Sequence, residues 1–169
     1  RQRIAKFRQW WLADRLERVK WVVQSGVEGE TPVWDHGLRG EGQILGHIDS
    51  QLNTAACWFA DPEGDPFGEN HRKIVYRGHE NINSSQIHGT HTAGVLTGDA
   101  QPISGNLFHR GIAYAARMAH TDYLSSDYDF YADLEQHHLQ GARVHTNSWG
   151  SSLQTYTETC ADLDAFSFD

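Results

Sequence analysis

The sequence predicts an α/β domain built on a mainly parallel sheet with helices on both faces. Short apolar stretches of strand character alternate along the chain with stretches of helical character, and such alternation implies right-handed crossovers between parallel strands. Parallel sheets place their functional groups at the carboxyl ends of the strands. Asp49 and Ser148 each stand at the end of a predicted strand, so we expect a functional site there.

Residues 1–26 are predicted to form an amphipathic segment distinct from the domain at 27–169. Apolar residues recur through most of this segment at helical spacing, although its β-branched end at 19–23 also fits a strand. The Gly, Pro and Asp residues that follow are typical of a connector. The segment is either a helix packed on the domain or the remnant of an inhibitory or chaperone pro-region.

The expected elements of residues 27–169 can be read in chain order. QILGHI and HRKIVYR have strand character, and the loop between them contains Pro and Gly residues that forbid regular structure. HGTHTAGVLTG starts a helix of small residues, and two later strands flank a second helix. The elements are a strand at 43–48, a loop at 60–70, a strand at 71–77, a helix from 88, a strand within 113–123, a helix at 129–140 and a strand at 142–148.

Charge and composition argue against several classes of protein. The net charge is −8, and the first twenty residues contribute +5 (seven basic, two acidic), which leaves −13 for the rest. Phosphate binding needs clustered cations, so no nucleic-acid partner is expected. No run of 18 apolar residues predicts a membrane span. Cys57 and Cys160 are too few for a zinc knuckle; they form either one disulfide or two buried free thiols.

Asp49 and His88 are a candidate catalytic pair. A carboxylate at the end of a buried strand needs an ionised neighbour or hydrogen bonds. An Asp that accepts the N–H of one ring nitrogen of a His fixes the tautomer and leaves the other nitrogen free to act as a base. Gly89 follows His88 and lets another backbone come close. Buried Asp and His residues also pair merely to satisfy their polar atoms, so this pattern alone leaves both interpretations open.

Three motifs follow one another in the chain. QILGHIDS ends in Asp49 and Ser50, HGTHTAG occupies 88–94, and SWG occupies 148–150. In this order they resemble the catalytic Asp strand, the H-G-T-H-x-A-G block and the S-x-G strand of the subtilisin-like serine proteases, the subtilases. RGIAYAARM is similar to the family's G-V-A-P-x-A segment with Tyr114 in place of Pro, and CWF and HRKIV resemble its larger, alkaline-protease-like branch. The resemblance extends from about residue 31 to 169.

The resemblance implies a subtilisin-like fold and a serine endopeptidase that cleaves polypeptides by acyl transfer. On this resemblance Asp49 orients the ring of His88, His88 is the general base, and His91 is a structural neighbour. Ser148, Trp149 and Gly150 correspond to the strand that pairs with an extended substrate. Catalysis needs no cofactor. Family members are usually exported, so a secreted or extracytoplasmic location is expected.

The chain departs from the family pattern in two respects. Gln51 stands where the family usually has Gly, so either Gln51 tolerates a backbone conformation that Gly eases or the turn differs. The family's oxyanion Asn and its nucleophile block, G-T-S-x-A, are not found in the 169 residues. We therefore expect the N-terminal portion of a catalytic domain, truncated before its C-terminal half and inactive alone, whose triad Ser lies beyond this chain.

Two other classes of function remain open at this point. A degenerate relative of the family would bind peptides along 148–150 without cutting them, and Gln51 is the best support for it. A metal-dependent hydrolase would use Asp49, His88 and His91 as ligands, although the chain lacks the glutamate of an H-E-x-x-H motif.

The remaining polar and aromatic clusters carry weaker expectations. His137 and His138 are adjacent on a predicted helix and are expected on a solvated surface. The acidic residues at 61–69 form either a solvated loop or a structural calcium site, which family members often have. The cluster of Trp10, Trp11 and Trp21 is expected in a core or an interface. Seven other histidines show no usable spacing: His36, His47, His71, His79, His109, His120 and His145.

Overall fold

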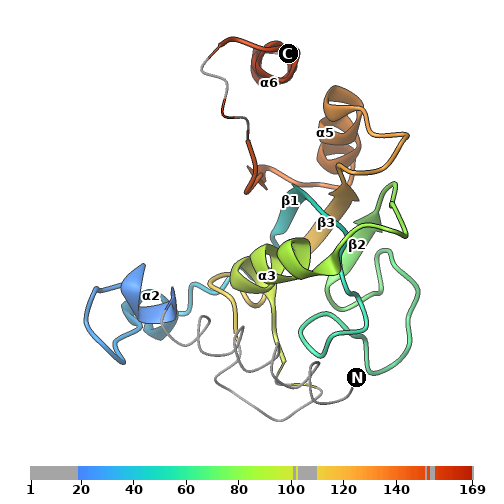
Figure 1. The fold of residues 1–169 in the computed structure, drawn as a ribbon. Helices are drawn as coiled ribbons and strands as arrows, with labels where there is room; N and C mark the ends of the chain where they lie inside the picture. The colour runs from blue at the N-terminus through green and yellow to red at the C-terminus, as the bar shows by residue number, and fades with distance from the viewer. Residues whose placement is uncertain (1–18, 101, 103–109, 151, 153–154, 169) are drawn as a thin grey trace.

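The centre of the molecule is a four-stranded, all-parallel sheet with the strand order β2-β3-β1-β4 (Figure 1). The computed structural model describes residues 19–100, 102, 110–150, 152 and 155–168. β1 is buried along nearly its whole length, because it lies between two strands and is covered on both faces. The predicted parallel α/β fold is confirmed. The strands are β1 (Ile44–Asp49), β2 (Ile74–Arg77), β3 (Arg117–Asp122) and β4 (Val144–Thr146).

The two central helices lie on opposite faces of the sheet, with α3 (Gln86–Thr97) below it and α5 (Phe130–Leu139) above it in Figure 1. α3 begins after Ser85, whose hydroxyl oxygen accepts the backbone N–H of Ile87. α5 begins after Asp129, whose carboxylate accepts the N–H of Ala132 at 3.0 Å. Two helices that the sequence did not predict complete the described fold, namely α2 (Pro32–Asp35) and α6 (Glu158–Phe168).

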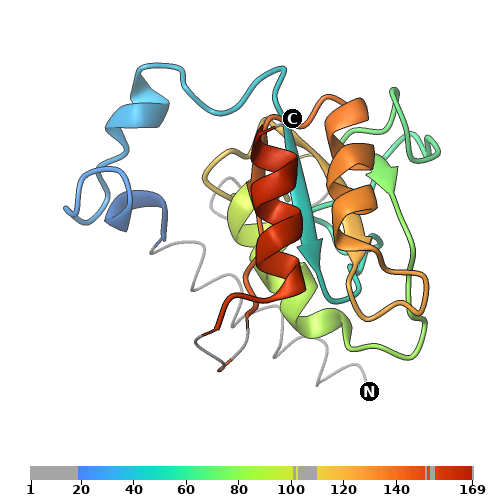
Figure 2. The ribbon, with the colours of Figure 1, turned by 90° about the horizontal axis from the view of Figure 1, so that it is seen from above.

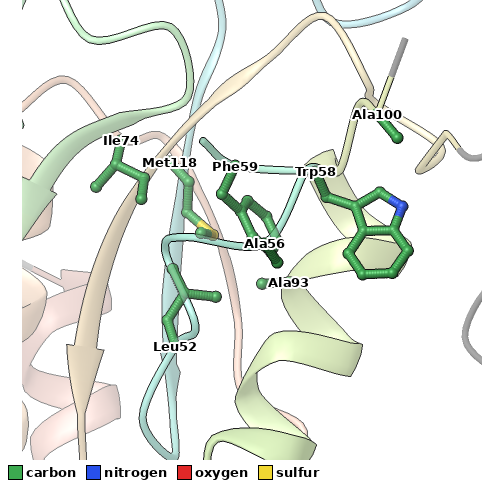
Figure 3. Packing of buried hydrophobic residues seen from close by; sticks show 8 residues of the cluster. All are labelled: Leu52, Ala56, Trp58, Phe59, Ile74, Ala93, Ala100 and Met118. Atoms are coloured by element: carbon green, nitrogen blue, oxygen red, sulfur yellow. The ribbon is translucent and has the colours of Figure 1, made fainter. Parts of the chain in front are cut away.

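An apolar cluster fills each face of the sheet. The cluster beneath α3 joins residues from β2, β3, α3 and the loop after β1 (Figure 3). The cluster beneath α5 is more aromatic, and α6 reaches it because α6 packs against α5 (Figure 2). The first cluster consists of Leu52, Ala56, Trp58, Phe59, Ile74, Ala93, Ala100 and Met118. The second consists of Ile48, Phe130 and Leu134, with Tyr123, Tyr128, Trp149 and Phe166 packed against them.

Lys73 is a buried cation at the amino end of β2. Only 2% of its surface is exposed, and its ammonium group donates to the carbonyl oxygens of Tyr114 at 2.8 Å and Ala116 at 2.5 Å. Burial lowers the pKa of Lys73 to about 7. Lys73 therefore ties β2 to the segment that leads into β3.

Several local expectations can be compared with the structure. Residues 19–22 are helical rather than a strand. Trp21 is partly buried. Trp10 and Trp11 belong to the first 18 residues, which lie outside the described residues. The loop at 60–70 has no regular structure, as predicted. The helix predicted from residue 88 begins two residues earlier, at Gln86, because Ser85 caps it. Among the described residues, no helix has the length and apolar character needed to cross a membrane.

The cysteines match neither of the two expected states. Both are free thiols, so they do not form a disulfide. Cys57 is half-buried, and burial raises the pKa of its thiol. Cys160 is exposed, near the start of α6, so the expectation of two buried thiols is wrong for it.

Candidate active site

The carboxyl end of β1 and the first turn of α3 bring Asp49 and His88 together. Nδ1 of His88 lies 2.6 Å from Oδ1 of Asp49. Asp49 is completely buried, whereas 56% of the His88 side chain is exposed. A carboxylate acceptor at this distance requires the hydrogen on Nδ1, which leaves Nε2 of a neutral ring with a lone pair. The two side chains that the sequence predicted to meet are thus in direct contact.

Asp49 is supported by further donors, which explains how a buried carboxylate is tolerated. The backbone N–H of Ser50 donates to Oδ1 at 2.7 Å. The hydroxyl of Thr92, one turn after His88 on α3, donates to Oδ2 at 3.1 Å. Hydrogen bonds from neutral donors stabilise the ionised form of a buried acid. Both oxygens of Asp49 are therefore occupied, and the carboxylate plane is fixed relative to His88.

Gly89 allows α3 to approach the chain that leaves β1. Its N–H donates to the hydroxyl oxygen of Ser50 at 2.9 Å. A Cβ atom placed on Gly89 would lie 1.9 Å from the carbonyl oxygen of Ser50, so no other residue fits without movement of the backbone. The expected close approach of a second backbone beside His88 is observed. Among the described residues only glycines have positive φ, so the backbone of Gln51 does not adopt the left-handed conformation that favours glycine.

Asp122, at the end of β3, fixes the loop that leads into α3. It lies beside Asp49 in the register of the sheet and is completely buried. Its Oδ2 accepts the N–H of Asn81 at 3.0 Å and the hydroxyl of Ser84 at 2.8 Å. The position of His88 is thus determined from both sides, by β1 through Asp49 and by β3 through this loop.

The SWG motif follows β4 after a one-residue gap. Ser148 and Gly150 are exposed, and Trp149 is partly buried. The indole N–H of Trp149 donates to the carbonyl oxygen of Ile48 at 2.8 Å, and its ring lies against Tyr123 with 5.2 Å between centroids. Trp149 therefore anchors the segment to β1, one residue before Asp49, and leaves its two neighbours accessible.

Four histidines lie between the sheet and the helices that cover it. The sequence showed no usable spacing for three of them, His47, His120 and His145, and predicted a solvated surface for the fourth, His137. His47 and His120 face α3, with their Nδ1 atoms 2.9 Å apart. On the other face of the sheet, His137 of α5 meets His145 of β4, and Nδ1 of His137 lies 2.8 Å from Nε2 of His145. Burial lowers the pKa of His47 well below its ordinary value and lowers those of His120 and His137 to about 3. Burial also lowers the pKa of His145 to about 4, so all four histidines are neutral at physiological pH.

The expectation that His137 and His138 form a solvated surface is wrong for His137. His138 is exposed, but His137 is completely buried, because it lies on the side of α5 that faces the sheet. Nε2 of His137 lies 3.0 Å from the hydroxyl of Thr121 on β3. Adjacent residues on a helix point in different directions, so one can be buried while the next is solvated.

The described residues do not gather the ligands of the metal-dependent alternative. No three His, Cys, Asp or Glu side chains among them are grouped so as to hold a metal ion, and this applies to Asp49, His88 and His91. In the acidic loop at 61–69, Asp61 accepts the backbone N–H groups of Glu63 at 2.9 Å and Arg72 at 2.7 Å. Its carboxylate thus shapes the loop.

A buried Asp hydrogen-bonded to an exposed His at the carboxyl end of a parallel sheet is an arrangement that occurs in several families of hydrolases. Comparison with protein families identifies the particular class. The model of the subtilase family, Peptidase_S8, matches residues 40–167. The chain belongs to the subtilase family, as its three motifs predicted.

Similar proteins occur in Dictyostelium discoideum. The chain is 38% identical to the serine protease/ABC transporter B family protein tagD and 35% identical to tagB, in each case over 153 residues or 80% of the chain. It is 29% identical to tagA over 163 residues, or 87% of the chain. The aligned regions span only 8–9% of the length of these curated relatives.

Proposed function

We propose that residues 27–169 supply the Asp and His of a subtilisin-type serine endopeptidase. The observation that carries the proposal is the hydrogen bond of 2.6 Å between Nδ1 of an exposed His88 and the buried carboxylate of Asp49. Membership of the subtilase family supports it. The names of the relatives, which include serine protease, agree with it.

In the proposed mechanism His88 moves the protons. Nε2 of His88 takes the proton of a serine hydroxyl as that oxygen attacks the peptide carbonyl, and later gives the proton to the leaving amine. Asp49 keeps the hydrogen on Nδ1 and stabilises the imidazolium. Among the described residues no serine hydroxyl hydrogen-bonds to the His88 ring, so the proposal assigns the nucleophile and the oxyanion donor to residues of the longer protein.

The proposed substrate is an extended polypeptide. The exposure of Ser148 and Gly150, on both sides of Trp149, supports pairing of this segment with a substrate strand, which gives affinity that does not depend on side-chain sequence. An extracytoplasmic location belongs to the same proposal and rests on the family alone. In this proposal residues 1–26 are either a helix packed on the domain or the remnant of a chaperone or inhibitory pro-region whose positive charge complements the acidic domain.

The test compares peptide hydrolysis by the complete protein and two histidine variants. His88→Ala should reduce kcat by about 10⁴-fold or more, because the general base is lost. The control is His138→Ala, which removes another exposed histidine on α5 and should leave kcat unchanged. Labelling by a fluorophosphonate, which reacts with an activated serine, should fall in parallel. Hydrolysis that survives in purified His88→Ala contradicts the proposal.

A further inference from the structure

A second histidine lies directly behind the Asp49–His88 pair. His47 precedes Asp49 by two residues on β1, so both side chains lie on the face of the sheet covered by α3. Nε2 of His47 lies 3.0 Å from the hydroxyl oxygen of Thr92 and 3.9 Å from Oδ2 of Asp49. The first distance is a hydrogen bond and the second is not. His47 therefore reaches Asp49 through Thr92.

The hydroxyl of Thr92 has more acceptors within reach than it has hydrogens. Besides Oδ2 of Asp49 at 3.1 Å, the carbonyl oxygens of His88 at 3.1 Å and Gly89 at 3.2 Å could accept its single hydrogen. If Nε2 of His47 carried a lone pair, it would compete as well. If instead Nε2 carries a hydrogen, His47 is a donor to Thr92 and leaves the hydroxyl free to donate onward. The tautomer of His47 thus decides whether Asp49 gains this hydrogen bond.

His120 selects that tautomer. Both rings are completely buried and neutral, so a single hydrogen lies between their Nδ1 atoms. Nε2 of His120 has no hydrogen-bond partner among the described residues. A buried lone pair without a partner is tolerated better than a buried N–H without an acceptor. The hydrogen therefore belongs to Nδ1 of His120, which donates to Nδ1 of His47, and the hydrogen of His47 is on Nε2.

The geometry points to His47 as a positioning residue for the catalytic carboxylate, in a directional chain of donors that runs from His120 through His47 and Thr92 to Oδ2 of Asp49. A carboxylate is a stronger acceptor than the two competing carbonyl groups, so a hydroxyl that already accepts from His47 donates to Asp49. This series of hydrogen bonds fixes the plane of the Asp49 carboxylate and disperses part of its negative charge. Oδ1 then remains directed at His88.

Four titratable groups act electrostatically on His47, from all the neighbouring elements: Asp49 on β1, His120 on β3, His88 on α3, and His145 on β4, which lies on the opposite face of the sheet. Of these only Asp49 is negative, and its effect on His47 is smaller than those of burial and of His120. His47 thus stays neutral, and this series of hydrogen bonds persists at any pH at which Asp49 is ionised. The catalytic meaning of the inference rests on the proposed function, whereas the hydrogen-bond chain does not.

The test measures the pH at which His88 is half protonated, from the rate of hydrogen exchange at the ring C2 atom of each histidine read by mass spectrometry. This readout works in the complete protein and does not need activity. Thr92→Val keeps the side-chain shape and removes the donor, so Asp49 stabilises the His88 imidazolium more strongly and the midpoint should rise by about 0.5 pH unit. Thr92→Ser keeps the hydroxyl and should leave the midpoint within about 0.1 pH unit.

Variants of the histidine separate positioning from stability. His47→Leu removes the donor to Thr92 but leaves the Thr92 hydroxyl in place, so the midpoint should rise by less than in Thr92→Val. His47→Gln, whose amide can place an N–H near the position of Nε2, should restore the wild-type midpoint. The matched control is His137→Leu, which removes another completely buried histidine bonded to a threonine hydroxyl and should lower stability without moving the midpoint. An unchanged midpoint in folded Thr92→Val, or an equal rise in His137→Leu, overturns the inference.

Activity provides an independent arm. If the complete protein hydrolyses peptides, the acid limb of its kcat profile should move upward with the midpoint in Thr92→Val and His47→Leu. A protein without hydrolytic activity would refute the proposed function, while the exchange measurement would still decide the inference.

Discussion

Replacing Gly89 by Ala should damage both stability and the proposed catalysis, because this residue sets the contact between α3 and β1. The added methyl group would begin 1.9 Å from the carbonyl oxygen of Ser50, and ordinary contact begins at 3.4 Å. The helix and the chain after β1 must therefore separate by about 1.5 Å. A separation of this size breaks the N–H bond from Gly89 to Ser50 and lengthens the 2.6 Å contact between His88 and Asp49.

The expected free-energy change can be estimated from these contacts. A clash with backbone that cannot rotate away costs about 3 kcal/mol, and the lost hydrogen bond costs about 1 kcal/mol. The helix propensity of Ala offsets about 1 kcal/mol. The free energy of unfolding should thus fall by about 3 kcal/mol, and kcat/KM of the complete protein by about 100-fold, since a misplacement of about 1 Å has that effect.

Urea denaturation followed by circular dichroism measures the first quantity, and peptide hydrolysis measures the second. The control is Ile87→Ala, on the same turn of α3 with half of its surface exposed, which should change the free energy of unfolding by about 0.5 kcal/mol. Wild-type stability and activity in Gly89→Ala would refute the reasoning, because the close approach of the two backbones would then have no energetic weight.

Three further predictions concern other parts of the domain. In the complete protein, His88→Ala should abolish turnover while His91→Ala mainly lowers stability; equal catalytic loss with unchanged stability in both would contradict this division. Trp149→Phe should lower the free energy of unfolding by about 1–2 kcal/mol in a urea titration, because the Ile48 carbonyl loses its donor. The pKa of Lys73, about 7 in the folded state against an ordinary 10.5, means that the unfolded state binds more protons between these values. Wild-type stability should therefore rise with pH there, by about 1.4 kcal/mol per pH unit relative to Lys73→Met, and equal pH dependence of the two urea midpoints would exclude the effect.

The fold was predictable because its central strands have simple patterns. QILGHI is apolar and short, which suits a strand that is buried on both faces of a parallel sheet. α6 was missed because none of its residues is fully buried in the described structure. Among them only Phe166 packs against an apolar cluster, so no repeated core positions mark the helix in the sequence. The start of α3 was placed two residues late because the family motif begins at His88, whereas the capping residue is Ser85.

The candidate site was predictable only where a motif marks it. Asp49 and His88 belong to recognisable motifs, and Gly89 has a clear steric reason. His47 and Thr92 were missed, although each had a usable signal: His47 is two residues before Asp49 on a strand, and Thr92 is four residues after His88 on a helix. His137 was assigned to the wrong environment. Two neighbouring residues on a helix, such as His137 and His138, point in different directions, but the sequence does not show which of them faces the sheet.

The strand order has a consequence for how the protein is made. β1 has no partner nearby in the sequence, since it pairs with β3, 73 residues later, and with β4 beyond that. At about 5–20 residues per second on the ribosome, the centre of the sheet waits roughly 4 to 15 s for its first neighbour. During that interval every nascent chain exposes the apolar β1 with the hydrogen-bonding groups of both its edges unpaired. The yield of folded protein should therefore depend on chaperone capacity and on the speed of translation through residues 50–122.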